Sequence, residues 1–421
     1  MPLPMPSSPS PYMPLPMPSS HHSYLHIPFC RQKCPYCKFA LTPVFDAAKK
    51  RRYIAHLKKE IQDYFLSSWA CEGSARCWDT ADSSYRQNDR GTNTIYFGWG
   101  TPSVLSLDEV RELLELFPWR ENIEVSFECN PEDITENYIE WLLCLGINRL
   151  SIGVQSLNNE TLKAIHRSDR ESILDALSCI TDAMTHTQKN KDNNFEEREY
   201  NAIVSSFWVT ASQPPSLNID FILGLPFSKP WETLRDIRIL HEQFPCITHT
   251  SVYMLEDGYY PASWKQDSIQ ENEMESEYTK ICEYFNSIGW HHYEISNWSK
   301  GGYECRHNQS YWDHSEYRWF GLSATSFSGL NRSEKSASFA WYYRSEMSYE
   351  DLLDEEDLAL EKIIYGIRTF SLPEGDFDRS ILSTLQEKWY IQIENGKIVL
   401  TPTWIFRENT IISTLIDKMP P

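Results

Sequence analysis

The feature that most restricts the fold of this chain is a regular alternation of short apolar segments with amphipathic ones, from Tyr24 to about Phe327. The apolar segments have the length and composition of strands and lie at 24–27, 94–97, 124–128, 149–154, 216–222 and 248–255. The amphipathic segments have helical spacing and lie at 47–66, 107–116, 137–145, 159–165 and 231–244. Because repeated strand-then-helix units form parallel sheets, we predict an α/β fold, either an open sheet or a barrel. Ligands of such folds collect at the carboxyl ends of the strands.

Composition shifts divide the chain into three parts. Residues 1–20 repeat the proline-rich unit MPLPMPSS, so we expect a disordered tail or an upstream start that is not used. Residues 21–345 form the main domain, with polar surface insertions at about 67–92 and 185–215. Residues 346–421 are helix-rich with a short strand pair, and we predict a small, mainly helical C-terminal domain, for which a winged helix is a candidate form. We expect the segment 361–370 to pack it on the main domain.

Charge and cysteine usage restrict the partners. The net charge of −20 argues against nucleic acid and against anionic membrane surfaces. The sequence has no run of about 18 apolar residues that could span a bilayer. Eleven cysteines, an odd number, without a signal peptide indicate a reducing compartment, with thiols that are buried or bind metal. We therefore expect a cytoplasmic protein.

The strongest chemical signal is a CxxxCxxC loop formed by Cys30, Cys34 and Cys37, directly after the first strand. Three thiolates at this spacing can bind three irons of a cubane cluster and leave the fourth iron open. A zinc site is the alternative, but structural zinc sites take four ligands in paired CxxC motifs. The next cysteines, Cys71 and Cys77, fall in a predicted insertion. We therefore predict an iron–sulfur cluster on the three cysteines.

The segment 24–39 around this loop resembles the opening of a radical S-adenosylmethionine (SAM) family, the oxygen-independent coproporphyrinogen oxidases and their haem-chaperone relatives, called HemN and HemW. Further segments resemble the family's motifs in the same order: GWGTPS at 98–103, SFECNP at 126–131, RLSIGVQS at 149–156, NIDFILGLP at 218–226, YEISNW at 293–298 and YECRHNQSYW at 303–312. The ordered series covers most of the chain.

The resemblance implies an incomplete parallel (β/α) barrel, a [4Fe-4S] cluster and SAM bound at the open iron. It also implies SAM contacts from the residues that match the family's motifs: Tyr24, Tyr36, Gly98, Gly100, Thr101, Glu128, Gln155, Arg167 and Asp220. Several have simpler explanations, because the two tyrosines could pack a loop, the glycines could serve an ordinary turn and Arg167 could be a solvated helix end. Met254 is better explained by core packing than by a contact with adenine. No catalytic residue is assigned.

Two features favour the haem-chaperone branch. Phe39 stands where the dehydrogenase branch has a fourth cysteine, and His307, Tyr311 and Trp312 fit the HNxxYW signature of the chaperones. A neutral imidazole can bind haem iron while the aromatic pair covers a macrocycle. A single histidine is more often structural, and Cys305 is an alternative ligand.

Departures from the family leave three functions open. Trp99 replaces a glycine beside the expected SAM amino group, where its indole could crowd SAM or turn outward to solvent. Cys129 stands where the family usually has alanine, and Lys38 stands where the chaperone branch commonly has an acidic residue. We favour a haem-binding chaperone that delivers haem to acceptor proteins, including membrane-associated ones, and uses an electron donor. The alternatives are an anaerobic coproporphyrinogen III dehydrogenase of porphyrin biosynthesis and a degenerate cluster-binding protein.

Overall fold

The fold was analysed in a computed structural model of the chain. The described residues are 21–42, 46–70, 92–118, 122–192, 214–255, 260–266, 269–377, 379–388, 390–401, 405, 411–413 and 415. The tail at 1–20 and most of the insertions predicted at 67–92 and 185–215 lie outside these residues.

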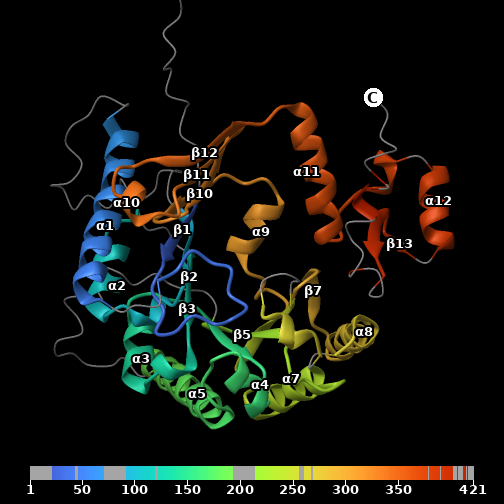
Figure 1. Ribbon diagram of the computed structural model, residues 1–421, viewed down its shortest axis with the longest axis horizontal. Helices are drawn as coiled ribbons and strands as arrows, with labels where there is room; N and C mark the ends of the chain where they lie inside the picture. Colours follow the sequence, from blue (N-terminus) through green and yellow to red (C-terminus); the bar gives the residue numbers. More distant parts are fainter. Residues whose placement is uncertain are drawn as a thin grey trace, which may run out of the picture.

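A 12-stranded sheet forms the body of the protein, in the order β12-β11-β10-β9-β1-β2-β3-β4-β5-β6-β8-β7. Its central strands run parallel from β1 to β6: β1 His21–Ile27, β2 Thr92–Trp99, β3 Glu124–Cys129, β4 Arg149–Gln155, β5 Ser216–Leu223 and β6 Ile247–Met254. The sheet curves but does not close, because β12 and β7 are its two edges (Figure 1). This is the incomplete parallel barrel that the resemblance implied.

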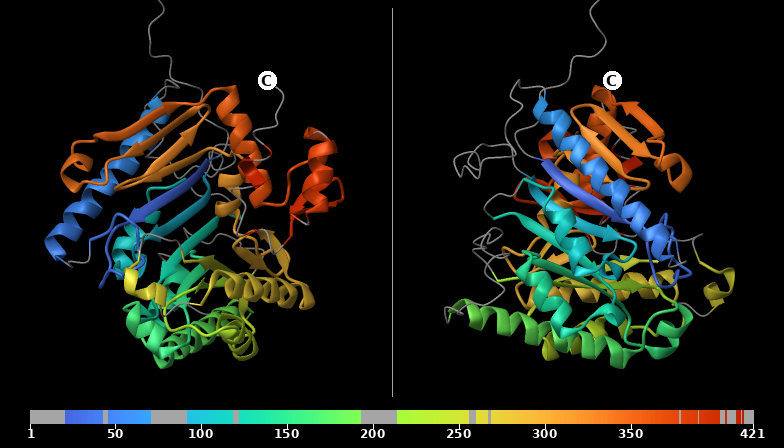
Figure 2. Two further views of the ribbon diagram at one scale, coloured as in Figure 1. Left: turned by 45° about the vertical axis from the view of Figure 1, so that its right-hand side comes forward. Right: turned by 90° about the vertical axis from the view of Figure 1, so that its left-hand side faces the viewer.

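Helices cover the outer face of the curved sheet (Figures 1 and 2). They are α1 Ala47–Ala70, α2 Leu107–Leu114, α3 Glu136–Cys144, α4 Asn159–Ala164, α5 Arg170–Asp192, α7 Glu232–Gln243 and α8 Glu271–Ser287, with 3-10 turns at Pro102–Val104, Pro131–Asp133 and Ala262–Gln266. Local sequence fixes their starts: Ser106 caps α2 in a capping box with Glu109, and Thr135 accepts from the backbone N–H of Tyr138 at the start of α3. Buried aliphatic and aromatic side chains of the strands pack against these helices and form the core.

Short antiparallel strands extend the sheet at both edges. They are β7 His291–Glu294, β8 Asn297–Ser299, β10 Thr325–Ser328, β11 Asn331–Lys335 and β12 Met347–Leu352, whereas β9 Tyr317–Phe320 pairs parallel to β1. Two short helices, α9 Arg306–Trp312 and α10 Phe339–Tyr342, lie between them in sequence. The large sheet therefore continues past residue 346, where the sequence predicts the C-terminal domain to begin.

The C-terminal lobe consists of α11 Glu355–Arg368, the 3-10 turn Glu374–Asp376, α12 Arg379–Glu387 and the hairpin β13 Ile391–Glu394 and β14 Lys397–Leu400. Asn395 and Gly396, both with positive φ, form the tight hairpin turn. The lobe lies beside the barrel beyond α11 (Figure 1). No helix among the described residues is both long and apolar enough to cross a membrane.

Candidate functional site

A cavity of about 360 Å³ opens at the carboxyl ends of the parallel strands. Most of the predicted cluster and SAM residues border it: Cys30, Cys34, Tyr36, Cys37, Gly100, Thr101, Glu128, Gln155, Arg167 and Asp220. They come from the loop after β1, the turn after β2, strands β3 to β5 and the turn after α4. The fold thus brings together residues that lie almost 200 positions apart in the sequence.

The cysteine loop is held closed by backbone pairing. Phe29 and Thr42 form an isolated parallel bridge, and the Thr42 N–H donates to the Pro28 carbonyl oxygen at 2.8 Å. Inside the loop, the Cys37 N–H donates to the Cys34 carbonyl oxygen at 3.0 Å. Cys30 is buried and the other two thiols are half-buried. The loop therefore presents three thiols to one cavity from a constrained backbone.

The three thiols of the loop are not gathered as the ligands of one metal ion would be. Three sulfur ligands of one zinc ion lie roughly 4 Å from one another, given Zn–S bonds of about 2.3 Å. Within the described part of the chain, the three cysteine sulfurs do not gather within 4.8 Å of one another. A cubane is larger than an ion and takes its ligands from more widely spaced thiolates. The donor set therefore fits the [4Fe-4S] cluster that the sequence predicts.

Burial keeps the thiols of Cys30 and Cys37 protonated in the absence of metal. Burial raises the pKa of Cys30 to about 11, although the Thr101 hydroxyl, which donates to its sulfur at 3.2 Å, lowers it. Burial also raises the pKa of Cys37. Cluster binding must therefore displace protons from this loop.

The turn after β2 fits closely against β1. The Gly100 N–H donates to the Ile27 carbonyl oxygen at 3.1 Å, and a Cβ on Gly100 would lie 2.2 Å from that same oxygen. Trp99 adopts a φ of 86°, which is strained for a non-glycine residue. Its indole stacks on His26 with ring centroids 4.5 Å apart and contacts Phe39 edge-on. The indole is therefore packed inward against β1 and the cysteine loop instead of turning to solvent.

Glu128 is the most perturbed carboxyl group of the cavity. Burial raises its pKa to about 7, nearby Asp220 adds to this rise, and hydrogen bonds from Trp99 and Tyr96 oppose it. The Trp99 backbone N–H donates to Glu128 Oε2 at 2.9 Å, which fixes the carboxyl group at the turn. A cationic ligand group beside Glu128 would favour its ionised form.

Arg167 is not a solvated helix end. Its guanidinium turns into the cavity, where it donates to the Asn130 side-chain oxygen at 2.6 Å and to the Gly153 carbonyl oxygen. Gln155 ends β4 with a φ of 68° and borders the same space. The two residues thus form one polar wall. Met254 also borders the cavity and is half-buried, so it is not simply core.

Tyr24 and Gly98 do not border the cavity. Tyr24 is 8% exposed and is stacked between Tyr96 and Trp319, with centroid distances of 5.2 Å and 4.4 Å. A Cβ on Gly98 would lie 2.3 Å from the Tyr24 hydroxyl oxygen. Both residues therefore support the wall from behind, and a direct contact with SAM stays a prediction.

The haem candidates lie on α9, inside the curve of the sheet (Figure 1). His307 is fully buried, with Nδ1 2.6 Å from the Thr94 hydroxyl and Nε2 2.6 Å from the Tyr311 hydroxyl. Burial lowers its pKa well below the usual value, so the ring is neutral. Trp312 faces the C-terminal lobe, where its ring contacts Tyr365 at 5.5 Å. The structure thus brings His307 and Tyr311 together, and both His307 nitrogens already have partners.

Sequence reasoning missed a buried polar network beneath Asp220. Ser151 and Asn218 each donate to the Asp220 carboxylate at 2.8 Å, and His249 links Asn218 to Tyr293 through bonds of 2.6 Å and 2.7 Å. The signal was the recurrence of polar residues inside strands that are otherwise apolar, since buried polar groups need partners.

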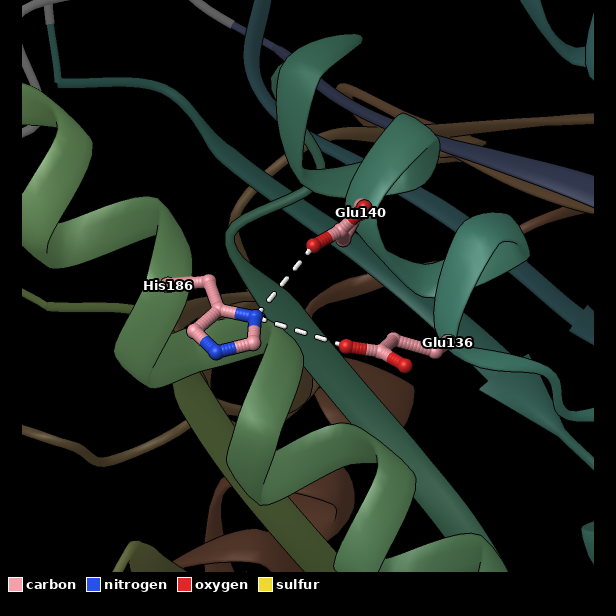
Figure 3. A group of neighbouring side chains, drawn as sticks. All are labelled: Glu136, Glu140 and His186. Carbon is pink, nitrogen blue, oxygen red and sulfur yellow. Dashed lines mark ion pairs between the residues drawn. The ribbon is translucent and has the colours of Figure 1, made fainter.

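A cluster outside the cavity joins two helices on the surface. His186 of α5 lies 3.3 Å and 3.6 Å from carboxylate oxygens of Glu136 and Glu140 of α3 (Figure 3). The three side chains are exposed or half-exposed and none borders the cavity. Their arrangement is that of a surface ion pair between packed helices, which contributes little stability.

Comparisons with known proteins agree with this geometry. The pattern of the Radical SAM superfamily matches residues 83–192. A Buchnera aphidicola protein named heme chaperone HemW is 29% identical over 306 residues, which cover 70% of this chain and 67% of that protein. The Bacillus subtilis protein of that name is 26% identical over 426 residues, covering 93% of this chain and 98% of that protein.

A solved structure shows the same fold. Coproporphyrinogen III oxidase (HemN) from Escherichia coli superposes with a TM-score of 0.70 and 17% identity, covering 95% of this chain and 91% of that one. The superfamily implies a [4Fe-4S] cluster and SAM, for which the cysteine loop and cavity provide ligands and space. The chain therefore contains a Radical SAM domain, resembles proteins named heme chaperone HemW in sequence and shares the fold of HemN.

Proposed function

We propose that this protein is a haem-binding chaperone that delivers haem to acceptor proteins. The observation that carries the proposal is its similarity to proteins named heme chaperone HemW over most of their length. Phe39 supports it, because the position that holds a fourth cysteine in the dehydrogenase branch is here an aromatic side chain that is 40% exposed.

The cysteine loop and the cavity would hold the resident cofactors. Cys30, Cys34 and Cys37 would bind three irons of the cluster, and Glu128 and Arg167 would contact the polar groups of SAM. When bound, these cofactors supply one-electron radical chemistry. The protein's own part is to hold them between the strand ends and to control access of water and substrate.

His307 is the proposed ligand of haem iron, and its surroundings set the cost of ligation. Nε2 must leave the Tyr311 hydroxyl before it can bind a metal. Breaking a buried hydrogen bond costs about 1–3 kcal/mol unless a new partner replaces it. We therefore propose that haem binding is coupled to a movement of Tyr311 or of α9, which would make association slow relative to diffusion.

A haemin titration of the cluster-loaded protein, followed at the Soret band under anaerobic conditions, tests the proposal. Saturable binding near one equivalent supports it, and His307→Ala should then shift the band and weaken binding. Tyr311→Phe is the matched control, because it removes the competing hydroxyl and should speed association without loss of the ligand. Absence of saturable binding in the unmodified protein would overturn the chaperone function.

Anaerobic coproporphyrinogen III dehydrogenase is the second candidate function. It is favoured by the cavity, which retains the three cysteines and most of the expected SAM residues despite Trp99. Turnover of coproporphyrinogen III with SAM and a low-potential reductant separates the two. Carbon dioxide release and protoporphyrinogen formation would establish the dehydrogenase, and a loaded protein that binds haemin without turnover would exclude it.

A further inference from the structure

Arg149 is a buried cation at the inner end of the cavity. It is the first residue of β4, is 4% exposed and borders the cavity together with Cys305 and Asn308. It lies far down the strand from Gln155, which ends β4 at the mouth. The predicted SAM contacts do not include it.

The hydrogen bonds of Arg149 leave most of its guanidinium unused. NH1 donates to the Ser216 hydroxyl and to the Tyr303 carbonyl oxygen, both at 3.0 Å, and both acceptors are neutral. A guanidinium carries five N–H donors. In the described part of the chain, Nε and NH2 of Arg149 have no hydrogen-bond acceptor. Neither nitrogen is fully enclosed by protein, so both are accessible. Arg149 borders both this cavity and a second pocket that Ser216 and Tyr303 also line, so these donors are accessible from one of the two spaces.

The carboxylates around Arg149 are committed to other groups. Glu124 accepts from the backbone N–H groups of Arg306 and His307 at 3.0 Å and 2.9 Å, and Asp220 accepts from Ser151 and Asn218. Among the described residues, none forms an ion pair with Arg149 within 4.0 Å. Glu124 attracts the guanidinium electrostatically without forming an ion pair with it. A buried charge without a directly bonded partner is costly, so the site favours an anionic ligand group.

Asn308 provides a second polar group at the same place. It is half-buried on α9 and borders the cavity, and no side-chain hydrogen bond occupies its amide among the described residues. Two other neighbours of Arg149 are uncharged. His249 has both nitrogens bonded, and burial raises the pKa of Cys305 to about 12, which keeps its thiol neutral.

We propose that Arg149 and Asn308 form a subsite for one carboxylate group, and that it receives a propionate side chain of the tetrapyrrole. The identity of the ligand rests on the proposed function. A propionate has the right charge, and it is a short arm on a macrocycle that His307, the proposed iron ligand next to Asn308 on α9, would hold near this end of the cavity. Asp220 and Glu128 on the walls would repel a polyanion, which favours a single carboxylate over a phosphate chain.

The test compares porphyrins with free and esterified carboxylates. Haemin and haemin dimethyl ester are titrated into the unmodified protein and into Arg149→Gln, Arg149→Lys and Asn308→Ala. Charged hydrogen bonds of this kind contribute about 1.5–3 kcal/mol, so Arg149→Gln should weaken haemin binding roughly 10-fold to 100-fold. Haemin dimethyl ester should bind the unmodified protein and all three variants with the same weak affinity. Arg149→Lys should bind haemin more tightly than Arg149→Gln does, because it keeps the positive charge. Arg306→Gln, which removes an exposed arginine of α9, is the matched control.

The outcomes separate this subsite from the proposed function. If haemin binds but Arg149→Gln folds and binds it as tightly, the subsite is wrong and the chaperone function stands. If Arg149→Gln does not fold, equal affinity of the unmodified protein for haemin and its ester overturns the subsite.

Metal-free coproporphyrin and its tetramethyl ester repeat the comparison without iron. Binding of coproporphyrin that depends on free carboxylates and Arg149, without haemin binding, would support the subsite and overturn only the chaperone function. Failure of all porphyrins to bind would overturn both.

Discussion

At the scale of single residues, the cysteine loop makes the sharpest prediction. Cys34→Ser should abolish the visible absorption of the cluster after anaerobic reconstitution, because two thiolates and a hydroxyl do not hold a cubane. Cys129→Ser is the matched control, since Cys129 is buried and borders the same cavity outside the loop. Iron and sulfide content should fall in the first variant and remain in the second. Equal content in both would contradict the ligand assignment.

Glu128 predicts a pH dependence of SAM binding. Its pKa of about 7 means that the carboxyl group is mostly neutral at pH 6 and mostly ionised at pH 8. If the ionised form pairs with the SAM ammonium group, affinity should rise with pH through 7 and level off above it. The expected gain between pH 6 and pH 8 is roughly tenfold, because each pH unit below the pKa reduces the ionised fraction about tenfold.

Calorimetric titration of the cluster-loaded protein at several pH values measures this gain. Glu128→Gln should bind more weakly and lose the slope, since an amide does not titrate. A slope that persists in Glu128→Gln would assign it to another group. A flat profile in the unmodified protein would favour a ribose hydroxyl as the partner of Glu128.

The placement of single residues could be predicted from sequence where a motif fixes both type and spacing, whereas their roles stay predictions. The three cysteines, Glu128, Arg167 and Asp220 border one cavity as expected. Exposure was not predictable in the same way. His307 matches a haem motif, but its burial against Thr94 and Tyr311 depends on contacts across 213 positions, which no local pattern encodes.

At the scale of elements, the turn after β2 is set by close packing of backbones. A Cβ on Gly100 would lie 2.2 Å from the Ile27 oxygen and 3.0 Å from the Phe29 nitrogen, atoms that the β1–β2 pairing holds in place. Gly100→Ala should therefore lower the free energy of unfolding by roughly 1–3 kcal/mol, as overpacking does, and displace the cysteine loop.

Chemical denaturation and cluster content check this effect. Gly301→Ala is the control, because nothing lies within 4 Å of a Cβ at that position. It should change the free energy of unfolding by no more than about 0.5 kcal/mol. Similar losses in both variants would show that the turn tolerates a side chain.

The parallel strands and their helices were predictable because each has a clear apolar pattern that extends over several consecutive residues. The strands from β7 to β12 were not, because most are four to six residues long and carry polar side chains on both faces. Their structure comes from pairing with neighbours that lie far away in sequence, such as β9 with β1. Tertiary contacts decide such elements.

At the scale of the whole molecule, α11 joins the C-terminal lobe to the barrel at the back of α9. Glu361 accepts hydrogen bonds from both terminal nitrogens of Arg332 on β11 and lies 3.3 Å from His314 Nε2. The Tyr365 ring contacts Trp312, and the Arg368 guanidinium lies over the same indole. The haem motif is therefore covered on one side by α11, which the Glu361 carboxylate helps to anchor together with the buried side chains of Ile363 and Ile367.

Glu361→Gln should loosen this anchor, since it leaves Arg332 without its charged partner in a partly buried place. Loss of a half-buried ion pair of this kind makes local opening easier by about 1–2 kcal/mol, so amide exchange in 355–368 should quicken roughly tenfold while β1 to β6 keep their protection. Glu355→Gln, in the exposed first turn of the same helix, is the control and should leave exchange unchanged.

Because Trp312 and His307 share α9, the proposed function further predicts faster haemin association in Glu361→Gln. Faster exchange in 355–368 without faster association would show that α11 holds the lobe in place but does not control access to His307.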